Sequence, residues 1–400
     1  MTGMVIIGAG ECGTRAALAL REAGYAGTVT LISGEAHAPY ERPPLSKQAI
    51  TAAAPEARPI GGSGRLAEAG IDFRPGRQVL GLDRVARRVV LAGATVPYER
   101  LLLATGARPR PLPGADGPHV ATLRTLGDAT RIRAALGPGR RLVVIGGGFI
   151  GLELAASARQ LATEVTVIEA LPRLLSRGVP TEIAAVLHAR HLAEGVSFHF
   201  DARIARITAA GVVLADGTCV RADLVVVGIG AVPNTELAAA AGLAVDNGIA
   251  VDVTLATADA GIFAAGDCCS FPQPLYDGRR VRLESWRSAQ EQGTLAARNM
   301  LGAAAPVTAV PWFWSDQYEL SLQIAGLADG AASQARRALP DGAFVLFHLG
   351  PDGRLLAAAG IGTGNAVARD IRLAEMLIAR RAHPDPAALT DVGVNLKRLL

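Results

Sequence analysis

Lysine is almost absent from this chain of 400 residues, although the chain carries 40 basic residues. Only Lys47 and Lys397 are lysines, and all other basic residues are arginines, so a lysine kept in this background draws attention. The net charge is only +4. That does not suggest a nucleic-acid-binding protein, because such proteins usually show a concentrated basic stripe. We therefore expect no nucleic-acid partner.

Paired cysteines and long apolar runs are also missing. The four cysteines form no Cys-x-x-Cys pair, which argues against a disulfide scaffold and a redox-active dithiol. No basic segment precedes the first apolar run, so no signal peptide is expected. The longest apolar stretch, residues 142–158, is interrupted by glycines and Glu153 and therefore predicts a strand, a turn and a helix, not a membrane span. We expect a cytoplasmic protein that binds no membrane. We expect three of its cysteines, Cys12, Cys268 and Cys269, to be small buried packing residues.

A strand–turn–helix pattern occurs twice. The first copy has an apolar strand over residues 4–7, a Gly-x-Gly-x-x-Gly turn, a helix, and a second strand that ends near Glu35. The second copy has a strand over residues 141–145, a similar turn and helix, and a strand that ends at Glu169. Such a turn, followed by an acid about 20 residues later, predicts a dinucleotide-binding Rossmann unit. The glycines of the two turns are Gly8, Gly10 and Gly13, and Gly146, Gly148 and Gly151.

Each residue type in these loops serves the binding of a dinucleotide. The first glycine allows the tight turn, the second lets the backbone approach the pyrophosphate, and the third lets the helix pack against the strand. The helix N-terminus supplies free N–H groups and partial positive charge, and the acid accepts hydrogen bonds from ribose hydroxyls. At the second loop Glu169 favours NADH over NADPH, because a carboxylate repels a 2′-phosphate, although Arg173 or Arg177 could bind one. Two loops predict two dinucleotides.

The repeat also indicates the domain order. Each copy is followed by an apolar strand that ends in glycine, at residues 101–106 and 224–230. We predict a discontinuous first domain over residues 1–112 and 234–306, and an inserted domain over residues 113–233. Alternating apolar strands and a final helix predict a separate α+β domain over residues 307–400.

Further motifs separate this chain from other proteins with two such loops. The stretch just after Tyr40, residues 41–47, contains no cysteine. In this stretch glutathione-reductase-like enzymes need a dithiol, and NADH peroxidases or coenzyme A disulfide reductases need one reactive cysteine. The motifs present span residues 39–47, 257–267, 282–286 and 311–318. Together they resemble the NADH-dependent ferredoxin reductases of bacterial oxygenase systems, and the resemblance covers the whole chain. It implies an α/β fold with two Rossmann-like domains, arranged as in glutathione reductase, plus the α+β C-terminal domain.

The resemblance implies FAD at the first loop and NADH at the second. A hydride would pass from NADH to flavin N5, and electrons would then pass singly to a 2Fe–2S ferredoxin or rubredoxin that serves an oxygenase. Lys47 would lie beside flavin N5, where a cation favours the anionic reduced flavin. Glu153 would neutralise Lys47, since an unpaired buried lysine is costly. The plainer alternatives are a solvated loop lysine and an exposed helix glutamate.

Other positions match cofactor contacts of the same family. Asp267 would receive hydrogen bonds from the ribityl chain at the N-terminus of a helix. Phe149 would cover the nicotinamide position until NADH arrives, and Glu284 would hold the carboxamide. Trp286 and Trp314 would lie near the isoalloxazine ring of the flavin. Core packing is the alternative for these two residues and for Phe149. The remaining expected cofactor contacts are Arg42, Val79 through its backbone, Ala104, Thr105, Gly106, Arg124, Ile150, Arg177 and Gly230.

The electron acceptor is the least determined part of the prediction. A basic face near the flavin edge would steer an acidic ferredoxin, and the candidates for it are Arg279, Arg280, Arg287, Lys397 and Arg398. Each could equally be an ordinary surface residue. One alternative is an NADH-dependent reductase of small quinones or oxygen. The other is a redox-sensing interaction module like the apoptosis-inducing-factor flavoproteins, against which the absence of long basic insertions argues mildly.

Overall fold

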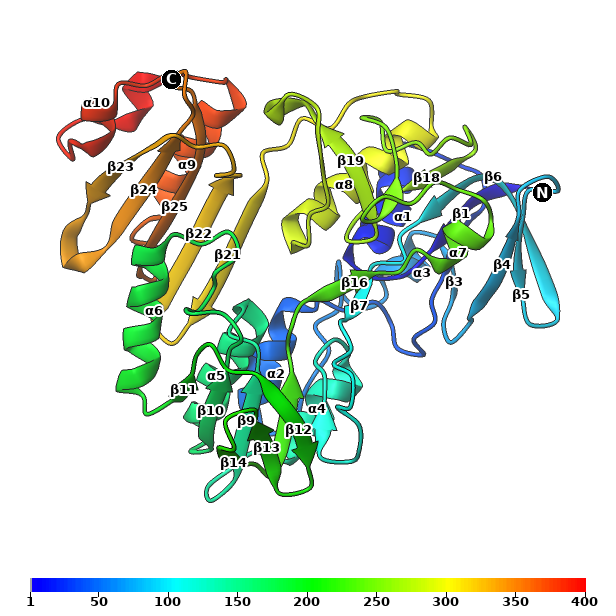
Figure 1. Ribbon diagram of the computed structural model, residues 1–400. Helices are drawn as coiled ribbons and strands as arrows, with labels where there is room; N and C mark the ends of the chain where they lie inside the picture. Colours follow the sequence, from blue (N-terminus) through cyan, green and yellow to red (C-terminus); the bar gives the residue numbers. More distant parts are fainter. Residues whose placement is uncertain (1) are drawn as a thin grey trace. The chain divides into compact units, whose positions relative to one another are not determined.

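The protein is described by a computed structural model that covers residues 2–400 and divides into two compact units (Figure 1). Unit 1 comprises the residues up to Glu41, Ala57–Arg108 and Val232–Ala309. Unit 2 comprises Arg42–Glu56, Pro109–Ala231 and Val310–Leu400. This division is coarser than the three predicted domains, whose boundaries stay a prediction.

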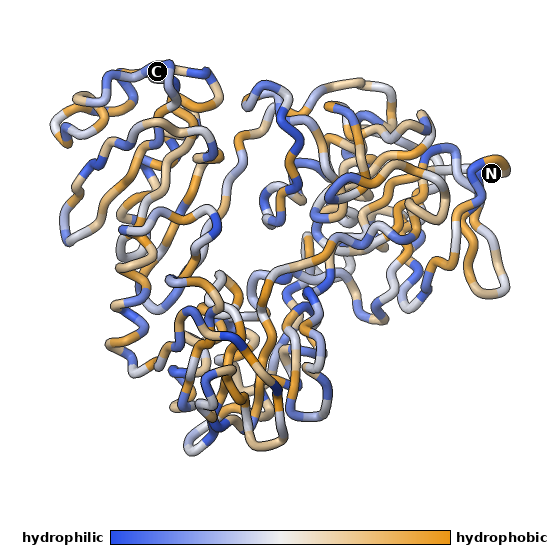
Figure 2. The backbone as a smooth tube through the Cα atoms, viewed as in Figure 1, coloured by the Kyte–Doolittle hydropathy of each residue, from blue (hydrophilic) through white to orange (hydrophobic). Residues whose placement is uncertain are grey.

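Unit 1 is built on a seven-stranded sheet in the order β3-β2-β1-β6-β5-β4, with β18 also paired to β6. At its centre β1 (Gly3–Ile7) lies between β2 (Val29–Ile32) and β6 (Ala94–Leu103), and both pairings are parallel. Every residue of β1 and β2 is buried. Strands covered on both faces have continuous apolar sequences, and the hydrophobic stretches in Figure 2 follow the strands of the sheets.

Strand β6 serves two different pairings. Its first half pairs antiparallel with β5 (Arg88–Leu91), and its second half pairs in parallel with β18 (Ile262–Ala264). Helix α1 (Glu11–Glu22) packs against α8 (Trp286–Met300). A Cβ on Gly293 of α8 would lie 2.3 Å from the Cys12 carbonyl oxygen, so only glycine permits this approach. The remaining elements of unit 1 include β3 (Asp72–Arg74), β4 (Val79–Asp83), β17 (Ile249–Ala250), β19 (Cys269–Gln273) and β20 (Arg279–Val281).

The middle of unit 2 is a second Rossmann sheet with parallel strands in the order β11-β10-β9-β15-β8. Helix α5 (Phe149–Gln160) follows its central strand, and α6 (Thr181–Ala193) precedes the edge strand. A three-stranded antiparallel sheet, β12-β13-β14, accompanies it. The strands are β8 (Val120–Ala121), β9 (Arg141–Ile145), β10 (Glu164–Ile168), β11 (Ser197–His199), β12 (Ile204–Thr208), β13 (Gly211–Leu214), β14 (Cys219–Arg221) and β15 (Leu224–Val227).

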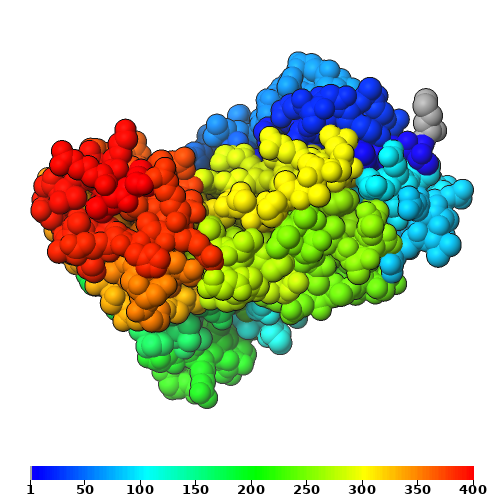
Figure 3. Space-filling view, turned by 90° about the horizontal axis from the view of Figure 1, so that it is seen from above, coloured from blue at the N-terminus to red at the C-terminus, as the bar shows by residue number. Residues whose placement is uncertain are grey.

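The C-terminal part of unit 2 is a five-stranded antiparallel sheet in the order β21-β22-β25-β24-β23, against which α9 (Ala368–Ala379) packs. The buried Arg337 binds Asp370 at 2.9 Å and donates to backbone carbonyls of the tail, including Asp391 and Val394. This fixes the last residues, which lie at the surface in Figure 3. The strands are β21 (Trp312–Gln317), β22 (Leu320–Gly326), β23 (Ser333–Ala338), β24 (Phe344–Leu349) and β25 (Leu355–Thr363).

The predicted fold class is confirmed, with two Rossmann-like sheets and an α+β C-terminal region. None of the helices formed by residues 2–400 has the length and hydropathy that a transmembrane helix needs.

Candidate functional site

The first glycine loop joins β1 to α1 in unit 1. Gly8 has φ +106°, and a Cβ there would lie 2.1 Å from the Ala104 carbonyl oxygen. A Cβ on Gly13 would lie 1.8 Å from the Gly8 oxygen. Beside Gly10, by contrast, the Cβ position meets no heavy atom within 4 Å among residues 2–400 apart from its own chain neighbours. The loop is therefore closed by its outer glycines and open at its middle one, where a pyrophosphate would sit.

The second loop, between β9 and α5 in unit 2, repeats this geometry. Gly146 has φ +108°, and a Cβ there would lie 2.4 Å from the Gly228 oxygen. A Cβ on Gly151 would lie 2.3 Å from the Gly146 oxygen, whereas the space beside Gly148 is open. No side chain caps α1 at Gly10 or α5 at Gly148 in the part of the chain that the structure describes. The first-turn N–H groups of both helices thus fit a phosphate.

The two predicted ribose-binding acids have different surroundings. Glu35 Oε2 accepts a hydrogen bond of 2.5 Å from the hydroxyl of Tyr40. Glu169 Oε2 accepts from the Gly147 N–H at 2.7 Å, and its Oε1 accepts from the Leu171 N–H at 2.9 Å. Glu169 is thereby held at the edge of the second loop.

One of the two arginines expected near a 2′-phosphate is already engaged. The Arg173 guanidinium donates to the carbonyl oxygens of Leu174 at 3.1 Å and Val179 at 3.2 Å. It therefore orders its own loop, while Arg177 is exposed. This arrangement strengthens the argument for NADH that rests on Glu169.

Residues Ala104, Thr105 and Gly106 follow β6, next to the first loop. Thr105 Oγ1 donates to the Asn234 carbonyl oxygen at 2.6 Å, and the Asn234 side chain returns a bond of 2.8 Å to the Thr105 oxygen. The Asn234 N–H also donates to the Gly106 oxygen at 2.9 Å. These reciprocal bonds fix the backbone after β6.

Asp267 does not begin a helix, which corrects one expectation. It lies in a turn between β18 and β19, followed by the β-forming residues Cys269, Ser270 and Phe271. The next α-helix along the chain, α8, begins only at Trp286.

Two other predicted cofactor residues of unit 1 have local partners. Glu284 forms an ion pair with Arg282. Val79 begins β4 and pairs with Leu91. Their expected contacts with the cofactors stay predictions.

The predicted ion pair of Lys47 and Glu153 is present within unit 2. Lys47 Nζ lies 3.1 Å from Glu153 Oε1, and the Glu153 side chain is only 4% exposed. Ser46 Oγ donates to Glu153 Oε2 at 2.5 Å and Ser315 Oγ donates to Oε1 at 2.7 Å. Lys47 Nζ also lies 5.6 Å from the centre of the Trp314 ring. A buried carboxylate with three donors is fixed in position and can hold the cation in place.

The first residues of α5 place two further candidates next to the second loop. The Phe149 ring lies 4.3 Å from that of Phe313, and Ile150 is exposed. Gly230 has φ +106°, and its carbonyl accepts from the Arg110 N–H at 2.9 Å. The predicted role of Phe149 at the nicotinamide position stays a prediction.

Arg42 and Arg124 come together in unit 2, because the Arg42 guanidinium donates to the Arg124 carbonyl oxygen at 2.6 Å. Arg42 immediately precedes the 3₁₀ turn η1 (Pro43–Ser46), which leads into Lys47. The Arg42–Arg124 contact therefore lies directly before the chain segment that carries the ion pair. The expected contacts of both arginines with FAD stay predictions.

Three of the four cysteines are buried, as expected. Cys12, Cys268 and Cys269 have raised thiol pKa values, chiefly because burial disfavours the thiolate. Only Cys219 is exposed. Residues 2–400 contain no cluster of His, Cys, Asp or Glu that could hold a metal ion.

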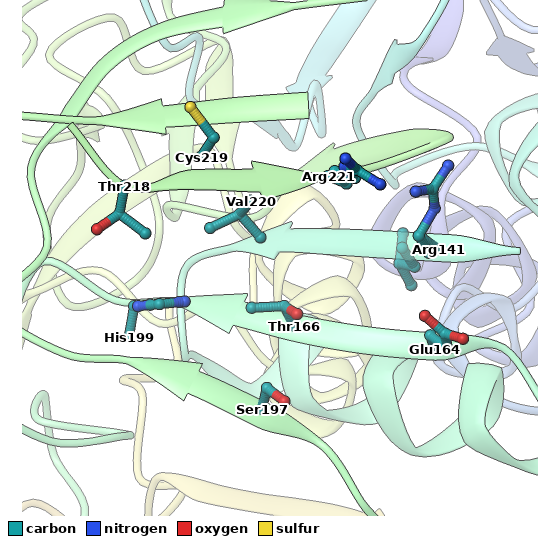
Figure 4. A pocket seen from close by; sticks show the side chains of 10 residues that line it. Arg141, Glu164, Thr166, Ser197, His199, Thr218, Cys219, Val220 and Arg221 are labelled. Atoms are coloured by element: carbon teal, nitrogen blue, oxygen red, sulfur yellow. The ribbon is translucent and has the colours of Figure 1, made fainter. Parts of the chain in front are cut away.

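A cavity of about 480 Å³ lies elsewhere in unit 2 (Figure 4). Its lining includes Arg141 and Glu164, the first residues of β9 and β10, and it extends to β14 at Cys219. A dinucleotide binds beyond the carboxyl ends of such strands, so this cavity is not the predicted cofactor site.

Several residues of the site were not predicted from the sequence. Ser46 and Ser315 bind Glu153, and Tyr40 binds Glu35. All three lie inside the motifs quoted above, so their positions were visible while their partners were not. Glu11, in the first loop, accepts from Gln290 at 2.7 Å, and burial raises its carboxyl pKa.

The comparisons with known proteins agree with this geometry. Residues 2–293 match the pyridine nucleotide-disulphide oxidoreductase family, and residues 312–400 match the reductase C-terminal family. The anthranilate 1,2-dioxygenase system ferredoxin–NAD(+) reductase component of Burkholderia cepacia is 45% identical over 99% of this chain and 98% of its own length. Rhodocoxin reductase of Rhodococcus erythropolis is 41% identical over 98% and 93%.

A solved structure shows the same fold over the whole chain. The reductase in the covalent putidaredoxin reductase–putidaredoxin complex is 37% identical, with a TM-score of 0.92 over 100% of this chain and 98% of that one. The family expected from the motifs is thereby confirmed. The chain belongs to the ferredoxin–NAD(+) reductases, FAD- and NAD-dependent oxidoreductases with a pyridine nucleotide-disulphide oxidoreductase region and a reductase C-terminal domain.

Proposed function

We propose that this protein transfers electrons from NADH through FAD to a 2Fe–2S ferredoxin of an oxygenase system, in the cytoplasm. The observation that carries the proposal is the pair of open glycine loops together with the buried Lys47–Glu153 pair. The names of the relatives, which include dioxygenase components and a rhodocoxin reductase, support the same direction of electron flow.

The N-termini of α1 and α5 would bind the pyrophosphates of the two dinucleotides. Glu35 and Glu169 would accept hydrogen bonds from the adenosine ribose hydroxyls. Because Glu169 is held by two backbone N–H groups, its charge stays where a 2′-phosphate would have to enter. This accounts for NADH as the preferred donor.

Lys47 would serve at the flavin as a fixed positive charge. When bound, FAD supplies the chemistry, because it accepts a hydride and gives up electrons one at a time. The protein contributes position and electrostatics: Lys47 presents its ammonium, and Glu153 keeps that ammonium neutralised and oriented. Phe149 would exclude water from the nicotinamide position, and Arg42, Arg124, Asp267, Trp286 and Trp314 would complete the FAD contacts.

The ferredoxin-docking residues form a separate part of the proposal. Lys397 and Arg398 are exposed on the C-terminal turn η4 (Leu396–Leu399) of unit 2, and Arg279 and Arg287 belong to unit 1. Arg280 donates to the carbonyl oxygens of Val251 and Ser270. We therefore expect the smallest docking contribution from Arg280.

Anaerobic stopped-flow mixing with NADH tests the first half-reaction. We expect loss of the oxidised-flavin absorbance, fast with NADH and slow with NADPH, followed by cytochrome c reduction that depends on added ferredoxin. Full turnover without a protein acceptor would instead indicate a reductase of small acceptors. A slow reaction with a long-lived charge-transfer band would indicate a sensing module.

Exchange of both Lys397 and Arg398 for Glu tests the docking residues. It should weaken only the ferredoxin-dependent step, with ferricyanide reduction as the control.

A further inference from the structure

A row of hydrogen bonds links the buried Glu153 to the surface of unit 2. Ser315 Oγ lies 2.7 Å from Glu153 Oε1, and Gln317 Nε2 lies 3.1 Å from Ser315 Oγ. Gln317 Oε1 lies 2.9 Å from His191 Nε2, and the hydroxyl of Tyr318 lies 3.3 Å from His191 Nδ1. We call these five residues the Glu153 chain. It joins helix α5 to strand β21 and helix α6.

The sequence of β21 explains why the chain exists. Alternate residues of a strand face the same side, so Phe313, Ser315 and Gln317 share one face. Phe313 packs on Phe149 at the start of α5, and Ser315 meets Glu153 one helical turn later. Ser315, Gln317 and His191 are all at most 1% exposed. A polar row this deeply buried is stable only when each member has a partner.

The carboxylate sets the direction of every bond in the row. Glu153 can only accept while it is ionised, so Ser315 must donate its proton to Glu153. Ser315 Oγ must then accept from the amide nitrogen of Gln317, which turns the amide oxygen toward His191. That oxygen requires a proton on His191 Nε2. Nδ1 of His191 is then the acceptor for the Tyr318 hydroxyl.

The surroundings of His191 agree with this assignment. Burial lowers its pKa to about 4, so at neutral pH the ring carries one proton. Arg190 lies over the Tyr318 ring at 4.5 Å and pairs with Glu194 and Glu319, which places the outer end of the row among solvated charges. At the inner end, Glu153 is paired with the cation Lys47.

We propose that Ser315, Gln317 and His191 are positioning residues, which aim a one-way row of donors at Glu153 and thereby hold its carboxylate in place against Lys47. Among the bonds that residues 2–400 show, Glu153 is the member of the row that pairs with Lys47, so the effect is transmitted through the carboxylate. The consequence for catalysis rests on the proposed function, in which Lys47 stands beside the flavin.

The direction of the row can be tested without catalysis. Histidine-selective ¹⁵N labelling of the holoprotein, with His191→Gln to assign the signal, reports the protonation of each ring nitrogen of His191. We expect the neutral form with the proton on Nε2 at pH 7. A proton on Nδ1, or a doubly protonated ring, would overturn the proposal.

The consequence is tested by the flavin midpoint potential, measured by spectroelectrochemical titration of folded holoenzymes. Glu153→Gln leaves Lys47 without its counter-charge, so the potential should become more positive, by at least about tenfold in the reduction equilibrium, or about 30 mV for a two-electron couple. Ser315→Ala should shift the potential in the same direction, by roughly threefold in the reduction equilibrium, because it removes a donor from the charged carboxylate. Gln317→Leu should shift the potential less, because it removes support from the carboxylate only through Ser315.

Conservative variants separate positioning from packing. Ser315→Thr keeps the hydroxyl, and His191→Gln keeps a donor toward Gln317, so both should stay close to wild type. His191→Leu lacks the donor and should resemble Gln317→Leu. Ser321→Ala removes a buried hydroxyl of the neighbouring strand β22 and serves as the matched control.

The outcomes are distinguishable. If Glu153→Gln shifts the potential while Ser315→Ala and Gln317→Leu match Ser321→Ala, the row does not position the carboxylate and the proposal is wrong. If Glu153→Gln leaves the potential unchanged, the placement of Lys47 beside the flavin is wrong. The row is then decided by the tautomer of His191 alone.

Discussion

The two glycine loops have nearly the same backbone, but the helices that follow them differ at one equivalent position. Two residues after the last loop glycine, α1 carries the half-buried Arg15 and α5 carries the buried Glu153. The ribose acids differ as well, because Glu35 is bound by a tyrosine hydroxyl and Glu169 by backbone N–H groups. The shared backbone explains why both loops can hold a dinucleotide. The different side chains explain why only one helix supports the lysine.

A methyl group added to either glycine loop should impair the binding of that loop's own dinucleotide and spare the other one. This is the largest effect on cofactor binding that we expect. Gly13→Ala places Cβ 1.8 Å from the Gly8 oxygen, and Gly151→Ala places it 2.3 Å from the Gly146 oxygen. We expect the first variant to lose FAD, and the second to keep FAD but lose NADH, each by more than about tenfold in affinity. Flavin absorbance per protein and NADH titration measure the two effects. Gly10→Ala, where Cβ meets open space, should keep the fold but weaken FAD binding.

Loss of FAD from Gly151→Ala would contradict this comparison of the two loops, since it would show that the second loop supports the first site.

The loops themselves could be predicted because glycine spacing and the flanking strands are local features of the sequence. Burial of Cys268 and Cys269 and the pairing of Lys47 with Glu153 were also predicted, the pair from the family resemblance.

The features that were missed depend on contacts between distant segments. Ser315 meets Glu153 across 162 residues and Gln317 meets His191 across 126, and neither pair has a spacing that a motif could reveal. The expected helix at Asp267 was wrong because the residues that follow it pair as β19 with strands β17 and β20, contacts that the local sequence does not reveal. The engagement of Arg173 by carbonyls of its own loop was missed because the loop conformation decides it.

A second variant sharpens the comparison of the two acids. Glu169→Ala removes the carboxylate that would face a 2′-phosphate and leaves the Gly147 N–H without its acceptor. We expect the ratio of kcat/KM for NADH to that for NADPH to fall about tenfold or more, with FAD content unchanged. Glu164→Ala, at the exposed start of the same strand, is the control. An unchanged ratio would show that Glu169 has only a structural role.

Acid stability should also differ between the two units. Of the seven histidines only His37 belongs to unit 1, where it is exposed. In unit 2 burial lowers the pKa of His191 to about 4, which is below the pKa of this histidine in the unfolded chain. At pH values between these two pKa values, His191 binds a second ring proton in the unfolded chain but not in the native protein. Stability therefore falls as the pH falls through this window, by about 2 kcal/mol between pH 7 and pH 5.

Urea unfolding of wild type and His191→Gln at these two pH values measures this contribution. The variant should show a smaller loss of stability on acidification, whereas His37→Gln should behave as wild type. Equal losses in wild type and His191→Gln would mean that His191 is protonated in the native state, which would also contradict the direction of the Glu153 chain.

The substitution that should disturb the protein least concerns the thiols, which divide between the units in the same way. Cys12, Cys268 and Cys269 of unit 1 are buried with raised pKa values, while Cys219 of unit 2 is exposed on β14. A thiol reacts as its thiolate, so a disulfide reagent should modify one thiol per native holoprotein quickly and the others at least about 100-fold more slowly. Cys219→Ser should remove the fast phase without changing flavin content. A fast phase that persists in this variant would show that the core around the first glycine loop opens in the native state. The two loops would then differ in stability as well as in side chains.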